Sequence, residues 1–197
     1  MYSASTAFTP AERKAIHERS RRNLLWLGIF SIIMVFAGFT SYYVVSMGSK
    51  GWVSIELPQA FWLSSAVILL SSVTMNMAQS SIKKGLNRRG AWWLLGTLLL
   101  GGIFTWSQFQ GWDALVANGV YFAGPTFTPG GGMLYVLTAV HVLHLAGGLI
   151  AVTFTGMKAW FGLYSPENML GVQLCSIYWH FLDALWIYLF LFLTIFK

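Results

Sequence analysis

The chain has 197 residues, is 56% hydrophobic and only 9% charged, and has a mean hydropathy of +0.63. Soluble domains carry roughly 25% charged residues, so the composition excludes an ordinary soluble domain and indicates an integral membrane protein. The net charge of +6 does not indicate a nucleic-acid-binding protein, because the basic residues cluster at the edges of apolar segments, where they set membrane orientation.

The first 23 residues are polar and basic, and they precede the first apolar run. We expect residues 1–23 to form a cytoplasmic tail that is mobile or lies at the membrane surface. Thr9 and Pro10, followed by Glu12, predict that a short surface helix starts near Pro10. The apolar run that begins at Leu24 is too long for a cleaved secretory signal, so we expect it to remain as a membrane span.

Five apolar runs are each long enough to cross the hydrocarbon core, which takes about 20 helical residues. We find no internal repeat and no second domain, so we predict an all-α fold: one five-helix membrane bundle over residues 24–197. The Gly- and Pro-rich segment 111–131 is predicted to be a loop outside the membrane. The predicted spans are 24–47, 59–81, 91–109, 132–158 and 169–196.

The distribution of basic residues predicts the orientation of the bundle. If the amino terminus is cytoplasmic, ten of the twelve Lys and Arg residues lie on the cytoplasmic side, and only Lys50 and Lys197 lie outside. Short loops rich in Lys and Arg stay in the cytoplasm. We therefore predict a cytoplasmic amino terminus and an external carboxyl terminus.

Small and polar side chains recur at helical spacing in the second, third and fourth spans. Helices in lipid associate through small residues and interhelical hydrogen bonds, so we expect these stripes to face the interior of the bundle. The stripes are Ser65, Ser72, Asn76 and Gln79; Thr97, Gly101, Thr105 and Gln108; and Thr138, His141 and Gly148.

Four ionisable residues lie deep in the last two spans. His180 and Asp183 are three residues apart, as are His141 and His144, so each pair shares a helix face. Ionisable groups at this depth cost free energy and need partners or a purpose. We expect the two pairs to meet near mid-membrane, because adjacent antiparallel helices bring these depths together.

Four interpretations of these residues compete. Three His and one Asp could ligate a metal ion, His141 and His180 could ligate one haem, and the His and Asp side chains could relay protons. We favour a structural polar network that fixes helix packing, with no catalytic, cofactor-binding or metal-ligating residue. Its predicted members are His141, His144, His180, Asp183, Gln108 and Thr138.

Each of the last three spans carries a motif. Gly102, Phe104 and Gln108 lie in the third span, and Thr138, His141 and His144, followed by Gly147 or Gly148, lie in the fourth. In the fifth span, Tyr178–Trp186 reads YWHFLDALW. The last motif resembles the Y-W-H-F-x-D-x-x-W signature in the last helix of subunit III of the haem–copper terminal oxidases. The other two resemble stretches of the two preceding helices of that family, and all three occur in the family's order.

The resemblance implies an accessory, non-redox subunit of a cytochrome c or quinol oxidase. It implies that haem and copper lie in partner subunits, with subunit I as the main contact and subunit II and small subunits nearby. It also implies bound phospholipid, support for proton uptake by subunit I, and a place in the bacterial cytoplasmic membrane. Larger members of the family have seven helices, so this chain resembles the short, five-helix form.

Three alternatives remain open from the sequence. The same fold could serve a nitric oxide reductase as an accessory subunit, because gas specificity lies in the partner. From other classes, the chain could be a stand-alone transporter or a haem b anchor. A transporter should show inverted repeats or broken helices, and the sequence shows neither.

Overall fold

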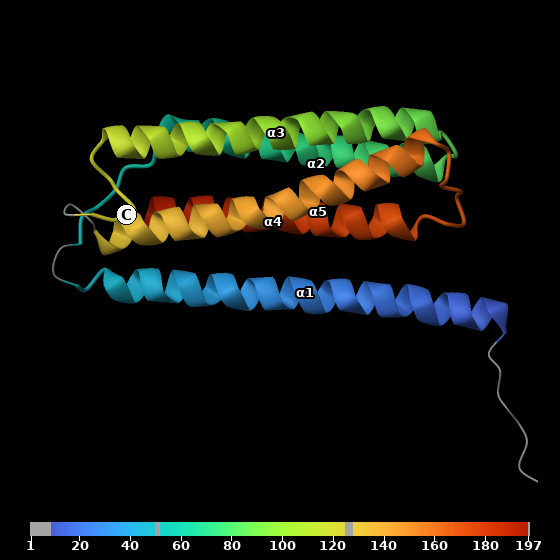
Figure 1. Ribbon diagram of the computed structural model, residues 1–197, viewed down its shortest axis with the longest axis horizontal. Helices are drawn as coiled ribbons and strands as arrows, with labels where there is room; N and C mark the ends of the chain where they lie inside the picture. The colour runs from blue at the N-terminus through green and yellow to red at the C-terminus, as the bar shows by residue number, and fades with distance from the viewer. Residues whose placement is uncertain (1–8, 50–51, 125–127, 197) are drawn as a thin grey trace, which may run out of the picture.

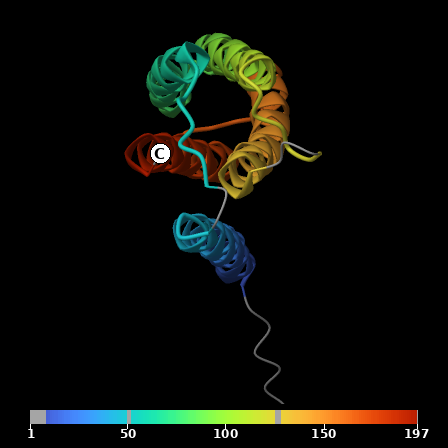
Figure 2. The same cartoon turned by 90° about the vertical axis from the view of Figure 1, so that its left-hand side faces the viewer.

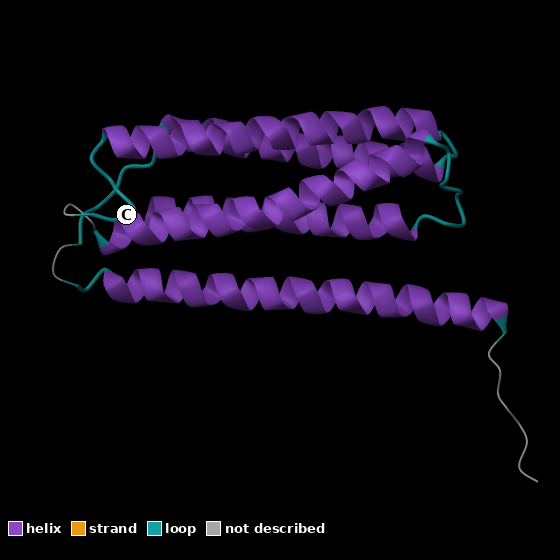
Figure 3. Cartoon of the chain, in the orientation of Figure 1, coloured by secondary structure: helices purple, strands orange, loops and turns teal. Residues whose placement is uncertain are grey.

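The computed structural model describes residues 9–49, 52–124 and 128–196, and within these ranges the chain forms long α-helices and no β-strand (Figure 3). Five of the helices are long and apolar enough to cross a membrane. The prediction of an all-α, five-helix membrane protein is therefore confirmed. The helices are α1 (Pro10–Ser46), α2 (Gln59–Lys83), α3 (Asn87–Ala117), α4 (Pro129–Trp160) and α5 (Leu170–Ile195).

The helices lie along one common axis, and four of them form a closed bundle (Figure 1). Seen along that axis, α2, α3, α4 and α5 surround a shared centre in that order, and α5 packs back against α2 (Figure 2). Helix α1 lies outside this ring and contacts α4 and α5. The interior of the ring is therefore built by residues from the last four helices.

Helix α1 packs on the ring through one narrow stripe, which includes Phe36, Thr40 and Tyr43. The Tyr188 hydroxyl donates to Thr40 Oγ1 at 3.2 Å, and the Tyr43 ring meets Phe192 edge-on with centroids 5.4 Å apart. Many other large side chains of α1 are apolar and exposed. This pattern suits a helix that faces lipid over much of its circumference.

The start of α1 differs from the predicted start of the first span. Thr9 caps the helix, its side-chain oxygen accepts from the Glu12 N–H, and the Glu12 carboxylate accepts from the Thr9 N–H. The surface helix predicted near Pro10 thus begins there, but it continues without a break into the apolar span at Leu24. The connecting residues are mostly Ala, Glu, Lys and Arg, which are good helix formers.

The segment predicted as the loop 111–131 is shorter in the structure, because α3 continues to Ala117 and α4 begins at Pro129. Gly111 lies inside α3, where an added Cβ would come within 2.9 Å of the Phe61 ring. This glycine permits close helix packing and does not end a helix. Thr128 caps α4 by accepting from the Gly131 N–H. Residues 125–127 of this loop lie outside the described ranges.

One end of the bundle collects the basic residues. At this end α1 begins, α2 passes into α3 and α4 passes into α5 (Figure 1). The predicted external residues Lys50 and Lys197 lie outside the described ranges, so the orientation of the bundle in the membrane stays a prediction. The bases at or near this end are Arg13, Lys14, Arg19, Arg21, Arg22, Lys83, Lys84, Arg88, Arg89 and Lys158.

Candidate functional site

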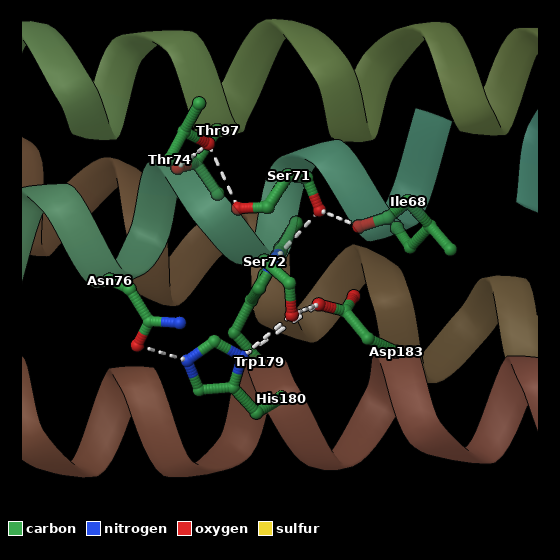
Figure 4. Close-up of polar contacts among 9 residues, drawn as sticks. All are labelled: Ile68, Ser71, Ser72, Thr74, Asn76, Thr97, Trp179, His180 and Asp183. Carbon is green, nitrogen blue, oxygen red and sulfur yellow. Dashed lines mark hydrogen bonds and ion pairs between the residues drawn. The ribbon is translucent and has the colours of Figure 1, made fainter. Parts of the chain in front are cut away.

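His180 and Asp183 share one hydroxyl group of α2, that of Ser72 (Figure 4). The Ser72 hydroxyl lies 2.7 Å from Asp183 Oδ2 and 2.8 Å from His180 Nδ1. His180 Nε2 lies 3.1 Å from Asn76 Oδ1. We call these four residues the Ser72 cluster. The predicted face shared by His180 and Asp183 is present, and the partners of both residues come from the predicted polar stripe of the second span.

The hydrogen bonds of the Ser72 cluster restrict where its protons lie. Ser72 has one hydroxyl proton, and a bond to Asn76 Oδ1 requires a proton on His180 Nε2. Two arrangements satisfy all contacts. Either His180 is an imidazolium and Asp183 a carboxylate, or both are neutral and the acid donates to Ser72, which donates to Nδ1. Both leave the cluster without net charge, which suits a group buried at membrane depth.

The Ser72 cluster does not continue into a longer chain of titratable groups in the described part of the protein. Its bonds end at the Asn76 amide on one side, and Asp183 Oδ1 is buried without a hydrogen-bond partner on the other. A proton can move between His180 and Asp183 through Ser72, but an amide does not carry protons onward. The geometry of the Ser72 cluster therefore suits a contact that joins α2 to α5, and it does not suit a path that conducts protons.

Two more serines on the same helix accept hydrogen bonds from tryptophans of α5. Ser71 Oγ donates to Ile68 O and accepts from Trp179 Nε1 at 3.0 Å (Figure 4). Ser65 repeats this arrangement six residues earlier, with Phe61 O as its acceptor and Trp186 Nε1 as its donor at 3.0 Å. Each of these hydroxyls donates its proton to a carbonyl oxygen of α2, so its oxygen lone pairs can accept a hydrogen bond from α5.

Trp179 is the central packing residue of the ring. Its side chain is completely buried, and its ring lies against Gly101 of α3 and Gly148 of α4. A Cβ at Gly101 would come within 2.8 Å of the indole, and one at Gly148 within 3.4 Å. Together with its bond to Ser71, Trp179 joins α5 to all three other helices of the ring.

Gln108 and Thr138 also lie in the interior, but each belongs to a separate contact. Gln108 Nε2 donates to Ser64 Oγ at 3.0 Å and joins α3 to α2. Thr138 Oγ1 donates to Leu134 O and accepts from Trp112 Nε1 at 3.0 Å, which joins α4 to α3. The Thr138 contact repeats the hydroxyl-to-indole arrangement of Ser65 and Ser71.

His141 is fully buried, yet neither ring nitrogen has a hydrogen-bond partner among the described residues. Its ring lies against Trp186 at a centroid distance of 5.3 Å and meets Phe104 at 5.9 Å. His144 points the other way, toward α1. Its Nδ1 bonds to Val140 O at 2.7 Å, and its ring lies 5.8 Å from that of Phe36.

The structure therefore divides the predicted polar network into separate groups. No hydrogen bond in the described ranges joins His141 or His144 to His180 or Asp183. The reason is rotational: His141 faces the aromatic centre, whereas His180 faces the outer edge between α5 and α2. The described residues also contain no group of three or more His, Cys, Asp and Glu side chains placed to hold a metal ion.

Several residues that organise the site were not singled out in the sequence. They carry a signal that could have been used, because serines recur in α2 at seven-residue spacing and two tryptophans of α5 stand seven residues apart. Such a repeat places both sets on matching faces of two helices. The missed residues are Ser64, Ser71, Trp112 and Thr74, whose hydroxyl lies 2.8 Å from that of Thr97 in the predicted stripe. Trp179 and Trp186 entered the sequence analysis as part of the YWHFLDALW motif, but their bonds to Ser71 and Ser65 were not predicted.

Comparisons with known proteins agree over most of the chain. The family described as cytochrome c oxidase subunit III matches residues 24–197. The chain is 31% identical over 189 residues to a probable cytochrome c oxidase subunit 3 of Nocardia farcinica, and 89% of each chain is covered. It is 29% identical over 170 residues to the cytochrome bo(3) ubiquinol oxidase subunit 3 of Pseudomonas aeruginosa, with 84% of this chain and 79% of the relative covered.

Proposed function

Since this chain belongs to the cytochrome c oxidase subunit III family, we propose that it is the accessory, non-redox subunit of a haem–copper terminal oxidase. The complex as a whole reduces O₂ to water and pumps protons, and its haem and copper are held by subunits I and II. Relatives include subunits of both cytochrome c and ubiquinol oxidases, so the partner subunits determine the electron donor.

The observation that carries this proposal is that the histidines of the last two spans make separate contacts within the bundle. His141 lies between two aromatic rings, and His180 bonds to Ser72 and Asn76. A haem with two axial histidines needs one imidazole nitrogen from each side, and these two rings serve different helix contacts. The arrangement supports a role in holding helices together, and through them the assembly of the oxidase.

The distribution of charge supports a location in the bacterial cytoplasmic membrane with the amino terminus inside. The basic end of the bundle faces the cytoplasm in this arrangement. Subunit III then flanks subunit I as its main contact, near subunit II and small subunits, and sustains proton uptake by keeping the subunit I surface packed and dry.

A shallow groove between α3 and α4 supports the proposed binding of phospholipid. It has a volume of about 270 Å³ and an apolar lining that includes Leu95, Leu98 and Gly156. At the basic end of the groove, the Arg88 guanidinium lies 5.2 Å from the centre of the Trp160 ring. An acyl chain fits the apolar lining, and the arginine supplies charge for the phosphate.

We expect Arg88→Gln to weaken binding of phosphatidylglycerol about fivefold, because a basic residue near an anionic lipid surface contributes about 1 kcal/mol. Native mass spectrometry of the purified complex during lipid titration measures the change. Arg89→Gln is the matched control, since Arg89 is also exposed but, among the described residues, only Arg88 of the two lies over the Trp160 ring. Equal effects of the two variants would contradict a site at Arg88.

The proposed function is tested by purifying the tagged chain from its native membrane in mild detergent. We expect the haem-bearing subunit to co-elute, identified by mass spectrometry, and the separated chain to show no Soret band. A chain that elutes without oxidase subunits, or that carries haem by itself, would contradict the proposal.

A further inference from the structure

His141 differs from the other buried polar side chains in the described part of the chain. Four residues there have buried side-chain atoms without a hydrogen-bond partner: Asn87, Gln108, His141 and Asp183. The other three each lack a partner at one oxygen and have a hydrogen bond at their second polar atom, whereas both ring nitrogens of His141 are unsatisfied. Buried polar groups are nearly always hydrogen-bonded to protein or to ordered water, so the imidazole needs a partner.

A second unsatisfied side chain lies at the same level of the bundle. Trp112 of α3 bonds to Thr138 of α4 at 3.0 Å, and this bond fixes the register of the two antiparallel helices. One turn from that bond, toward the basic end, α3 carries Gln108 and α4 carries His141. Both side chains are fully buried, and Gln108 Oε1 has no hydrogen-bond partner among the described residues. The two unsatisfied groups therefore lie at one level on adjacent helices of the ring.

The contacts of His141 place α2 and α5 at this level too. The rings of Phe104, His141 and Trp186 contact one another in a triangle, with centroids 4.9 to 5.9 Å apart. Trp186 Nε1 in turn donates to Ser65 Oγ of α2. All four helices of the ring thus contribute to one cross-section of its interior (Figure 2). We call the polar residues and the tryptophan at this level the His141 layer: Ser64, Ser65, Gln108, His141 and Trp186.

The hydroxyl and indole protons of the His141 layer are already in use. The hydroxyls of Ser64 and Ser65 both donate to Phe61 O, at 2.9 and 2.8 Å, and the indole N–H donates to Ser65. None of these protons reaches His141 or Gln108 Oε1. A neutral imidazole has one donor nitrogen and one acceptor nitrogen, and an amide oxygen only accepts. A small molecule that both donates and accepts can therefore serve the two side chains together, and water fills this role in protein interiors.

We propose that the His141 layer is a hydration site inside the bundle, where one buried water donates a hydrogen bond to Gln108 Oε1 and makes another with a ring nitrogen of His141. The water adds a polar link between α3 and α4, one turn from the bond between Trp112 and Thr138. It also provides a partner for a neutral imidazole within a membrane span, where a charged one would be costly. The inference depends only on the interior of this chain and not on the proposed function.

Electron cryomicroscopy of the chain, together with any subunits that co-purify, tests the hydration site at a resolution that shows ordered water. We expect a water peak about 3 Å from Gln108 Oε1 and about 3 Å from one ring nitrogen of His141. Absence of a peak in well-defined density, or a direct hydrogen bond between Gln108 and His141, would overturn the hydration site.

Solid-state NMR of the full chain in phospholipid vesicles provides a second readout. With ¹⁵N-labelled histidine, we expect magnetisation from water protons to reach a ring nitrogen of His141, which is assigned by the signal that His141→Phe removes. Nδ1 of His144, one turn away on α4, is the matched control, because it bonds to Val140 O at 2.7 Å. This nitrogen should receive no magnetisation from water. Failure of the transfer to His141 would contradict a water at its ring.

A substitution of the amide tests whether the water is shared. Gln108→Leu keeps the approximate size of the side chain but removes Oε1, so we expect the transfer from water to His141 to be lost. Thr153→Val, on the exposed side of α4, should leave the transfer unchanged. Transfer at full intensity in Gln108→Leu would overturn the shared site. If Gln108→Leu does not fold, the density between Gln108 and His141 in the unaltered chain decides.

Discussion

Replacing Trp179 with alanine is expected to destabilise the protein most, lowering the free energy of unfolding by about 3–5 kcal/mol, as large-to-small core substitutions of tryptophan do. The substitution removes the fully buried indole that packs against Gly101 and Gly148 and leaves Ser71 without its donor. Lipid cannot fill the resulting cavity, because the ring of four helices encloses it.

The measurement is denaturant unfolding of the purified protein in micelles, followed by circular dichroism. Trp106→Ala is the control, since this tryptophan of α3 is 67% exposed, and its loss should change the free energy of unfolding little. Trp179→Phe should recover part of the packing but not the bond to Ser71. Equal destabilisation by Trp179→Ala and Trp106→Ala would contradict the central role of Trp179.

Ser72→Ala is expected to lower the free energy of unfolding by about 1–3 kcal/mol, the cost of leaving buried polar groups unsatisfied. One hydroxyl serves both His180 Nδ1 and Asp183 Oδ2. These two atoms are 4.0 Å apart, which is too far for a direct hydrogen bond. Removal of the hydroxyl therefore breaks the bond from Ser72 to Asp183 and the bond from Ser72 to His180. Within the cluster, only the bond between His180 and Asn76 then joins α5 to α2.

The same unfolding assay separates this effect from a general loss of a serine. Ser31→Ala on α1 is the control, because its hydroxyl bonds only to its own helix at Leu27 O and is exposed. Combining Ser72→Ala with Asp183→Ala should cost less than the sum of the two single changes, since both remove the same bond. Strict additivity would show that Ser72 and Asp183 do not interact.

The membrane spans could be predicted because hydropathy is a local property of the sequence, and the bounds of α2 and α5 lie within two residues of the predicted ones. The end of α3 and the start of α4 could not be predicted in this way. Gly111 and the glycines after Pro129 read as loop residues, since glycine usually breaks helices. In this bundle Gly111 lies within α3 beneath the Phe61 ring, so its role depends on a neighbouring helix. Contacts of this kind are not visible in the sequence of one segment.

The polar site was predicted in part for a similar reason. The spacing of His180 and Asp183 fixes their shared face, and the stripe with Ser72 and Asn76 supplies their partners. The rotation of α4 relative to α5 is not encoded by spacing alone. It depends on how Gly148 fits against Trp179, and this fit turns His141 toward the aromatic centre and away from His180.

In the proposed function, the imidazoles of α4 and α5 hold helices together and ligate no redox centre. The direct measurement is the haem and copper content of the purified oxidase before and after this chain is stripped off by detergent. We predict that the remaining core keeps its full haem and copper per polypeptide and that the released chain carries neither. Loss of haem or copper in proportion to the chain removed would contradict the account.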